Sequence, residues 1–356
     1  MISISKPQFG DEELTLVREV LESGIVAQGP KVAQFEEEFA KLTQTEFAVA
    51  VSSGTTALHL ALLAHDIGPG DEVITSPFTF IASANSVLFT GARPRFVDIL
   101  PDTFNIDPAQ IEAAITPNTK AIMPVHLYGL MADMDAIMAI AERHNLVVIE
   151  DAAQAHGALY NGKPAGSIGS AGCFSLYATK NMTSAEGGMV TTNDPQIAER
   201  VKVLRQHGMR RRYYHDELGY NFRTTDLHAA VGIAQLRKVS DFNAARRRNA
   251  AFLNQHITRA ITPTEPDGYH HVWHQYTIRL TDTDRDAAVE QLKAAGVGSG
   301  VFYPVPVYRQ QVYLDRGYTD HLPVTEEVTA QVVSLPVHPA LTPADLETIV
   351  DAVQSL

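Results

Sequence analysis

Short apolar segments and helical segments alternate about six times along the N-terminal part of this chain. GDEVIT, KAIMPVHLYG and LVVIED are apolar runs of strand length, and the segments between them carry helix-start signals such as Asp107 followed by Pro108. This alternation predicts a mostly parallel sheet covered by helices on both faces. No GxGxxG sequence follows any of the strands, so the dinucleotide-binding fingerprint is absent.

The length and the change of pattern indicate two domains. A chain of 356 residues with 45% hydrophobic content has enough apolar side chains for one large core and a smaller one. The C-terminal part reads as a basic helix, a strand VWHQYTIRL, a helix from Asp284 to Ala295, a strand VGSGVFYPV and a terminal helix capped by Thr342. We therefore expect a large α/β domain over residues 1–240 and a smaller α+β domain over residues 241–356.

Charge and cysteine content narrow the classes of partner. The formal net charge is −13, whereas nucleic acids and anionic membranes are bound by surfaces with a basic excess, so we expect neither as a partner. The N-terminus lacks the pattern of a secretory signal, and no window reaches the length of a membrane span. The single cysteine, Cys173, excludes an intramolecular disulfide, and its apolar neighbours indicate a core thiol. These features predict a cytoplasmic protein.

Lys180 is the candidate catalytic residue. It lies between two short apolar runs, residues 173–178 and 189–190, where desolvation would favour the neutral amine. A neutral amine attacks aldehydes and forms Schiff bases; an ordinary surface-loop lysine is the alternative. Upstream, the segment VVIEDAAQAHG places Asp151 at the carboxyl end of a predicted strand, which is the edge at which α/β sheets bind ligands.

Two further segments follow predicted strands. Residues 53–56, in SSGTT, begin an apolar helix, where free backbone N–H groups and the helix dipole suit a phosphate, although serine and threonine are also ordinary helix caps. Phe80, in SPFTFIAS, is placed either to stack on a planar ring or to belong to the core. His126 and Tyr128 follow another strand and have the same two interpretations.

Two polar segments leave alternatives open. The segment MRRRYYHDELGYNFR combines arginines, two adjacent tyrosines and Asn221, and it either grips a phosphorylated ligand or forms a solvated loop. His270, His271 and His274 suggest a metal site, but no carboxylate shares their spacing. We therefore favour a core or solvated role for these histidines and expect no metal.

Six motifs occur in a fixed order along nearly the whole chain: SSGTTALHLAL, SPFTFIAS, VVIEDAAQAHGA, FSLYATKN with EGGMV, GYNFRTTDLHAAVG and VVSLPVHP. Together they resemble the DegT-type nucleotide-sugar aminotransferases, a family of fold-type I pyridoxal 5′-phosphate (PLP) enzymes. Six motifs in order are far more specific than any one of them. The resemblance implies the PLP-dependent transferase fold of type I and PLP as the cofactor.

The resemblance also implies roles for particular residues. The lysine that matches Lys180 carries PLP as an internal aldimine, the aspartate that matches Asp151 faces the ring nitrogen, and Gln154 matches a glutamine beside the phenolate oxygen. The other cofactor-binding positions that it implies are Phe80 for ring stacking, Gly54, Thr55 and Ser175 for the phosphate, and Asn221 for the phosphate of the neighbouring subunit.

The implied reaction passes an amino group from glutamate, or glutamine, to the 3- or 4-keto group of a nucleoside-diphosphate sugar. The implied assembly is a homodimer in which Asn221 and Arg223 of one subunit complete the site around Lys180 of the other; alternatively, Asn221 caps the following helix of its own chain. Another fold-type I lyase or desulfurase, and a PLP-binding regulator without turnover, remain as alternative functions.

Two positions refine the resemblance. A dehydratase branch of the family has histidine in place of the cofactor-binding lysine, so Lys180 indicates that the chain is outside that branch. Many relatives carry a histidine after the segment that matches FYPVPV, whereas this chain has Tyr308 there. We therefore assign no sugar-binding role to Tyr308.

Overall fold

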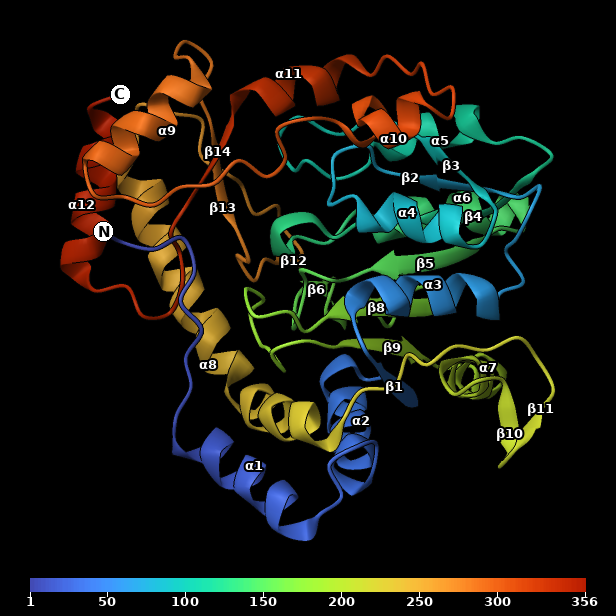
Figure 1. The fold of residues 1–356 in the computed structure, drawn as a ribbon. Coiled ribbons are helices and arrows are strands. Elements are labelled where there is room, and N and C mark those ends of the chain that lie inside the picture. The colour runs from blue at the N-terminus through green and yellow to red at the C-terminus, as the bar shows by residue number, and fades with distance from the viewer.

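The computed structural model describes residues 1–356, and its larger part is built on a seven-stranded sheet (Figure 1). The strands, in sheet order, are β1 (Phe47–Val51), β9 (Gly188–Thr192), β8 (Ala171–Ser175), β5 (Val147–Asp151), β4 (Thr119–Met123), β2 (Glu72–Thr75) and β3 (Arg93–Phe96). Only β9 is antiparallel to its neighbours, so the other six strands share one direction. The predicted α/β fold with a mostly parallel sheet is confirmed.

Helices pack on both faces of this sheet. One face packs against α1 (Asp11–Ser23), α2 (Pro30–Thr43), α5 (Pro108–Ala114), α6 (Met134–His144) and the first half of α8 (Asp226–His256). The other face packs against α3 (Gly54–Ala64), α4 (Ala82–Phe89) and α7 (Pro195–Arg205). Successive strand residues point to opposite faces, so that in β5 Val148 belongs to the first core and Ile149 to the second.

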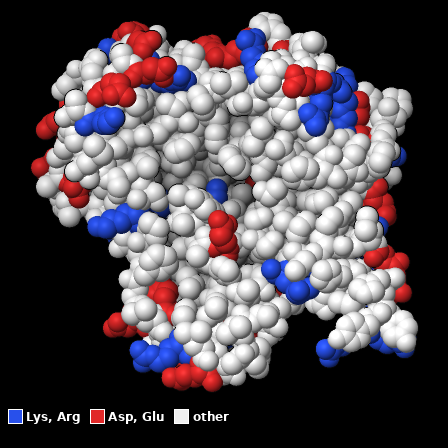
Figure 2. Space-filling view, in the orientation of Figure 1, with Lys and Arg blue, Asp and Glu red and all other residues white.

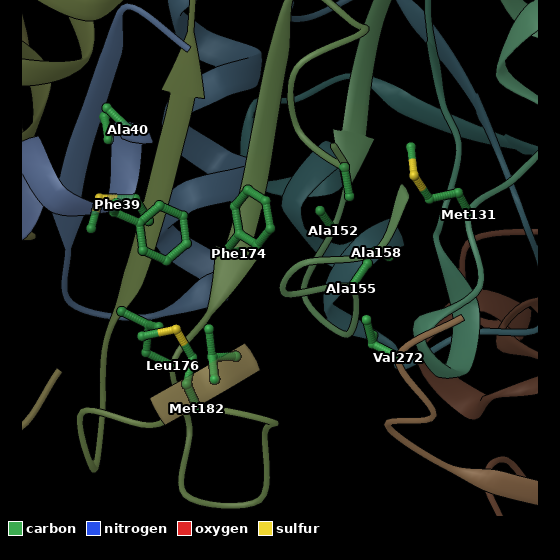
Figure 3. Close-up of a cluster of buried hydrophobic side chains, with 14 of the residues drawn as sticks. Phe39, Ala40, Met131, Ala152, Ala155, Ala158, Phe174, Leu176, Met182 and Val272 are labelled. Carbon is green, nitrogen blue, oxygen red and sulfur yellow. The ribbon is translucent and has the colours of Figure 1, made fainter. Parts of the chain in front are cut away.

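The first core also holds the loop that carries Lys180. Leu176 and Met182 lie on either side of the lysine in the sequence, and both are buried in this core together with Phe39 and Phe174 (Figure 3). The two phenylalanine rings meet edge to face, with centroids 5.0 Å apart. Apolar burial on both sides therefore fixes the ends of a short loop whose middle residue is cationic.

The C-terminal part forms a third core, separate from the two cores of the large sheet, around the other half of α8. This core contains residues of β13 (Tyr276–Arg279), β14 (Val332–Leu335), α9 (Arg285–Ala294) and α12 (Pro343–Gln354). The helices expected after Asp284 and Thr342 are confirmed, because the side chain of each of these residues accepts a hydrogen bond from the first turn of α9 or α12.

The strand predicted for residues 297–305 is wrong. Only isolated bridges form there, from Val297 to Ile2 and from Gly300 to Ser334. Pro304 within the segment and Pro306 directly after it have no N–H group for a ladder. Val332–Leu335 pairs with β13 instead.

The remaining elements are short. A three-stranded sheet contains β12 (Tyr269–His270), β6 (Leu159–Tyr160) and β7 (Lys163–Pro164), and a hairpin contains β10 (Met209–Arg211) and β11 (Tyr214–His215). The other helices are α10 (Gln311–Leu314), α11 (Pro323–Gln331) and two 3₁₀ turns, Leu127–Gly129 and Val307–Arg309. None of the helices combines the length and apolar character that crossing a membrane requires.

The two parts of the chain share elements. The helix α8 runs without interruption through residues 240 and 241 and contributes to the first core of the large sheet and to the C-terminal core. The segment after β13 also returns to the large sheet. There Phe302 and Val328 pack in one cluster with Phe78. The division at residue 240 stays a prediction.

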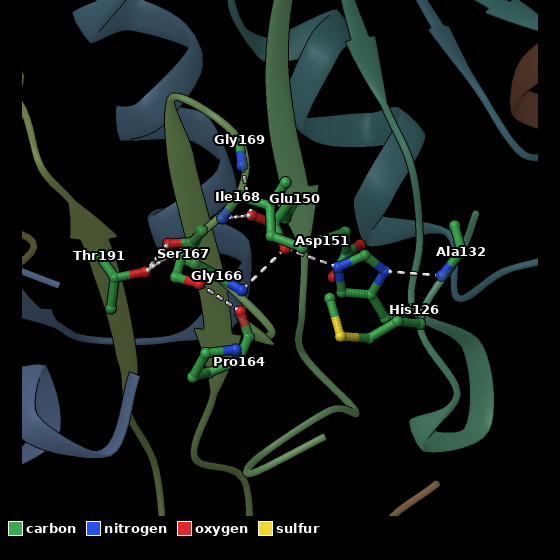
Figure 4. Close-up of polar contacts among 12 residues, drawn as sticks. His126, Ala132, Glu150, Asp151, Pro164, Gly166, Ser167, Ile168, Gly169 and Thr191 are labelled. Carbon is green, nitrogen blue, oxygen red and sulfur yellow. Dashed lines mark hydrogen bonds and ion pairs between the residues drawn. The ribbon is translucent and has the colours of Figure 1, made fainter. Parts of the chain in front are cut away.

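A buried carboxylate holds the end of β5 in place. Glu150 is fully buried and accepts hydrogen bonds from His126 Nε2 at 2.8 Å and from the backbone N–H groups of Gly166, Ile168 and Gly169 at 2.8, 2.8 and 2.6 Å (Figure 4). Burial acts to raise the pKa of Glu150, but the hydrogen bonds from His126, Gly169 and Gly166 outweigh it and hold that pKa below its usual value. Glu150 is therefore an ionised anchor between β5, the loop after β7 and the end of β4.

We predict that Glu150→Gln destabilises the fold by about 3 kcal/mol or more, because a neutral amide cannot accept from four converging donors. The folded pKa of Glu150 lies below the ordinary 4.5, so its contribution is complete above that value and is lost as the pH falls through the folded pKa. Urea unfolding at about pH 7 and about pH 4 should show a smaller difference between variant and wild type at the lower pH. Exposed Glu46→Gln is the control; a difference that does not depend on pH would contradict this account.

Candidate active site

A cavity of about 450 Å³ opens at the carboxyl ends of the parallel strands. Its wall combines residues that follow β1, β2, β4, β5 and β8 with residues of α8 and of the C-terminal part. The hollow near the middle of the face in Figure 2 has Lys or Arg atoms inside it and Asp or Glu atoms beside it. Seven of the eight predicted site residues line the cavity: Gly54, Thr55, Phe80, Asp151, Gln154, Ser175 and Lys180.

Lys180 lies in the loop between the antiparallel strands β8 and β9, at the edge of the sheet where the cavity opens. Its backbone N–H donates to the carbonyl of Tyr177, and its side chain is partly buried. Burial lowers the pKa of the Lys180 ammonium to about 8, while the negative charge of Asp151 acts in the opposite direction. The amine therefore loses its proton close to neutral pH, as a nucleophile or a base requires.

Asp151 is the last residue of β5, and it lies on the other face of the sheet from Glu150. Its Oδ2 accepts a hydrogen bond from Ser83 Oγ at 2.6 Å, and its Oδ1 accepts one from the N–H group of Ala153 at 3.2 Å. Burial raises the pKa of Asp151 above its usual value, against the effects of these two hydrogen bonds and of Lys180. The carboxylate thus has hydrogen-bond donors but no cation bonded to it, and a cationic ligand would relieve its desolvation.

The turn before α3 has the geometry of an anion site. Ser53 caps α3, because its Oγ accepts from the N–H group of Thr56 at 3.1 Å, and the first helical N–H groups have no partner inside the helix. A Cβ atom on Gly54 would lie 2.7 Å from Ser175 Cβ, and one on Gly188 would lie 2.2 Å from Ser53 O. Two glycines therefore allow β8 and β9 to approach this turn closely and leave a small, polar cradle.

Gln154 and Phe80 lie with Tyr303 on another wall. Gln154 Oε1 accepts from the N–H group of Tyr128 at 2.7 Å, and its Nε2 donates to the Tyr303 hydroxyl at 3.2 Å. Phe80 is 56% exposed, so it is not ordinary core, and its ring centroid lies 6.1 Å from that of Tyr303. An exposed aromatic ring beside a fixed amide is suited to hold a planar ligand.

Asn221 is not part of this cavity. It is exposed on the surface, where its backbone bridges to Gln206. The helix α8 is capped by Thr225, whose side chain accepts from the N–H group of His228, so the alternative that Asn221 caps this helix is wrong. Asn221 lies beside the β10–β11 hairpin.

The arginine-tyrosine segment forms that hairpin, which projects from the body next to α7 (Figure 1). Arg211 lies over the ring of Tyr214 at 3.5 Å, and Tyr213 is 74% exposed. The hairpin is thus an exposed aromatic projection, and it lies outside the cavity of its own chain.

The remaining candidates have structural contacts. His271 Nδ1 accepts from the N–H group of Trp273 at 3.0 Å, and no group of three ligand-type side chains is arranged to hold a metal ion. Tyr308 is buried and its hydroxyl donates to Glu326, away from the cavity. His126 belongs to the Glu150 network, and its Nδ1 accepts from the N–H group of Ala132.

Several residues of the cavity wall were not singled out from the sequence. They include Ser83, Tyr177, Glu186, Arg246 and Tyr303, and for His274 only a metal or core role was weighed. Ser83 lies in the first turn of α4, and its N–H group donates to the carbonyl of Phe80 just before the helix, so its short distance in sequence from Phe80 was the available signal. Tyr177 and Glu186 belong to the β8–β9 loop that carries Lys180. Arg246, His274 and Tyr303 come from segments that reach the cavity only through long-range packing.

Three curated proteins are similar to nearly the whole chain. A pleiotropic regulatory protein from Geobacillus stearothermophilus is 44% identical, covering 97% of this chain and 94% of the relative. GDP-perosamine synthase from Caulobacter vibrioides is 43% identical, covering 100% and 98%. UDP-N-acetyl-3-dehydro-alpha-D-glucosamine 3-aminotransferase from Acidithiobacillus ferrooxidans is 45% identical, covering 93% and 90%.

Solved structures agree with these relatives. DesV of S. venezuelae, in complex with a ketimine intermediate, is 40% identical, with a TM-score of 0.93 over 97% of this chain and 94% of that chain. The PLP-form of Spr1654 from Streptococcus pneumoniae is 29% identical, with a TM-score of 0.95 over 99% and 98%. The model of the DegT/DnrJ/EryC1/StrS aminotransferase family matches residues 7–354. The resemblance carried by the six motifs is confirmed: the chain belongs to this family of PLP-dependent aminotransferases.

Proposed function

We propose that the chain transfers an amino group from L-glutamate, or from glutamine, to the 3- or 4-keto group of a nucleoside-diphosphate sugar. The observation that supports this most is that Lys180 and Asp151 line one cavity at the carboxyl ends of the strands. Two of the relatives are named for reactions on GDP- and UDP-sugars, which supports a nucleotide-sugar substrate. We keep the predicted cytoplasmic location as part of this proposal, since the only thiol is buried and free.

The residues of the cavity fit PLP. The turn at Gly54 and Thr55, with Ser175 opposite, would hold the phosphate, because a Cβ at Gly54 would fill this cradle. Phe80 would cover a face of the ring. Gln154 Nε2 is the donor that would meet the ring's phenolate oxygen.

PLP supplies an aldehyde that exchanges amino groups and a ring that withdraws electrons from the reacting carbon. Asp151 would keep the ring nitrogen protonated, and the hydrogen bond from Ser83 fixes the orientation of its carboxylate. Lys180 Nζ would bond the cofactor at rest and, when freed by the donor amine, would move a proton from the donor's α-carbon. Its lowered pKa, about 8, suits both acceptance and release of that proton.

We predict that sodium borohydride, added to the PLP-loaded protein, fixes a pyridoxyl group on Lys180, as read by peptide mass analysis. Lys180→Ala should bind PLP without a covalent bond and lose about a hundredfold or more in the rate of glutamate deamination, because one amine serves both linkage and proton transfer. Exposed Lys163→Ala is the matched control and should behave as the wild type. A pyridoxyl group on another lysine would overturn the assignment.

A second candidate function is regulation without turnover, which the name of the Geobacillus relative favours. Release of 2-oxoglutarate from glutamate in the presence of a panel of GDP- and UDP-keto sugars separates the candidates. An aminotransferase releases it in step with an amino sugar, a lyase or desulfurase releases other fragments from its amino acid, and a regulator releases none although it binds PLP.

We further propose that the protein acts as a homodimer with composite sites, in which Asn221 and Arg223 of one subunit approach the phosphate cradle of the other. The exposed position of Asn221 outside its own cavity supports this proposal, as does the projecting hairpin beside it. An isologous contact across a two-fold axis would complete both sites at once.

Mixed dimers test this arrangement. Lys180→Ala and Asn221→Ala should each be inactive, whereas their coexpression should restore about a quarter of wild-type activity, because random pairing gives half mixed dimers with one intact site each. Asn161→Ala, an exposed asparagine far along the chain, is the control for Asn221→Ala. If size analysis confirms that dimers form and the coexpressed sample still has no activity, Lys180 and Asn221 serve the site of the same chain.

A further inference from the structure

Arg246 is a buried cation without an anionic partner. It lies on α8 and is only 6% exposed, yet no carboxylate pairs with it. Its Nη1 donates to the carbonyl oxygens of Trp273 and His274 at 3.1 and 3.3 Å, while its Nε is buried without an acceptor. The other arginine with comparable burial, Arg205, also has a buried Nε without an acceptor, but its Nη1 is paired with Glu36 at 2.6 Å. An unpaired buried guanidinium costs the fold free energy, which indicates a ligand rather than a structural partner.

Contacts along α8 place Arg246 beside the catalytic loop. Asn243 precedes Arg246 by three residues, so both lie on one face of the helix. The Oδ1 atom of Asn243 accepts a hydrogen bond from Asn181 Nδ2 at 2.8 Å, and Asn181 directly follows Lys180 in the sequence. Arg246 and Lys180 share the wall of the main cavity, and they also share the wall of a second cavity of about 20 Å³.

Among the ionisable side chains that line the cavity, Arg246 is the one that stays positively charged. The ionisable groups of aspartate, glutamate, histidine, lysine and arginine that line it are Asp151, Lys180, Glu186, Arg246 and His274. Burial, together with the charges of Lys180 and Arg246, lowers the pKa of His274 far below its usual value, so this histidine is neutral. Under the proposed function Lys180 is engaged with the cofactor, and Arg246 remains available for an anionic substrate.

We infer that Arg246 binds the α-carboxylate of the amino donor, which makes the site selective for α-amino acids. This inference rests on the proposed function. The α-carboxylate is attached through a single bond of about 1.5 Å to the carbon from which Lys180 takes the proton, so its partner must adjoin Lys180. The diphosphate of a nucleotide sugar is attached at the anomeric carbon, several bonds from a 3- or 4-keto carbon, and must lie farther out. A guanidinium also matches a carboxylate through two parallel hydrogen bonds.

The test pairs a change in the protein with a change in the ligand. The donors are L-glutamate and L-glutamic acid α-amide, which differ only at the α-carboxylate, and the measured quantity is kcat/KM for each in the donor half-reaction of the PLP-loaded protein. The wild type should prefer glutamate by about 10- to 100-fold. Arg246→Met should bring this ratio close to one, and Arg246→Lys should give an intermediate ratio.

The control is Arg248→Met, which removes the same charge from the exposed side of the same helix and should leave the ratio unchanged. A structural role for Arg246 would lower kcat/KM for both donors by the same factor and would overturn the inference. A rise in KM for the keto sugar with an unchanged donor ratio would assign Arg246 to the diphosphate and overturn it equally.

A binding measurement separates this inference from the proposed function. If the wild type shows no turnover with any donor, the proposed function fails, and calorimetry on the PLP-loaded protein then measures the affinity for L-glutamate directly. A loss of affinity in Arg246→Met but not in Arg248→Met would still support the carboxylate site, whereas equal affinities would overturn it. Arg246→Lys, which keeps a cation in this position, serves in both measurements if Arg246→Met does not fold.

Discussion

The alternation of side chains at the end of β5 is the constraint on which this site depends. Successive residues of a strand point to opposite faces, so Glu150 and Asp151 cannot share an environment. Glu150 accepts four hydrogen bonds that tie β5 to the loop after β7 and to His126. Asp151 faces the helices α3 and α4 and is held by Ser83 of α4. A one-residue shift of this strand would exchange the anchor and the functional carboxylate.

Most of the large sheet and part of the site could be predicted because their signals are local. A strand, a glycine-containing turn and a helix follow one another within the SSGTT segment, and VVIED runs directly into the residues of the cavity. Parallel strands bring such strand-end residues to one edge whatever the length of the connections between them. Lys180 belongs to this class, since both strands beside it are visible as apolar runs.

The rest of the site depends on packing between distant segments. Three adjacent arginines in α8 look equivalent in sequence, but of the three only Arg246 lines the cavity. Arg247 donates to the carbonyl of His271 instead. The buried positions Asn243, Arg246 and Asn249 recur at helical spacing, so the inward face was detectable, but not what it would meet. The wrongly predicted strand at 297–305 has the same origin, because β14 pairs with β13 in its place.

Burial of two cations in one cavity gives them different roles because lysine and arginine start from different pKa values. Desolvation disfavours the charged form of both. It lowers the pKa of Lys180 from 10.5 to about 8, so this amine exchanges its proton near neutral pH. It lowers the pKa of Arg246 from 12.5 to about 10, so the guanidinium keeps its charge there. A single low-dielectric cavity thus provides a base that gains and loses its proton and a cation that stays charged. The difference comes from residue type rather than from separate environments.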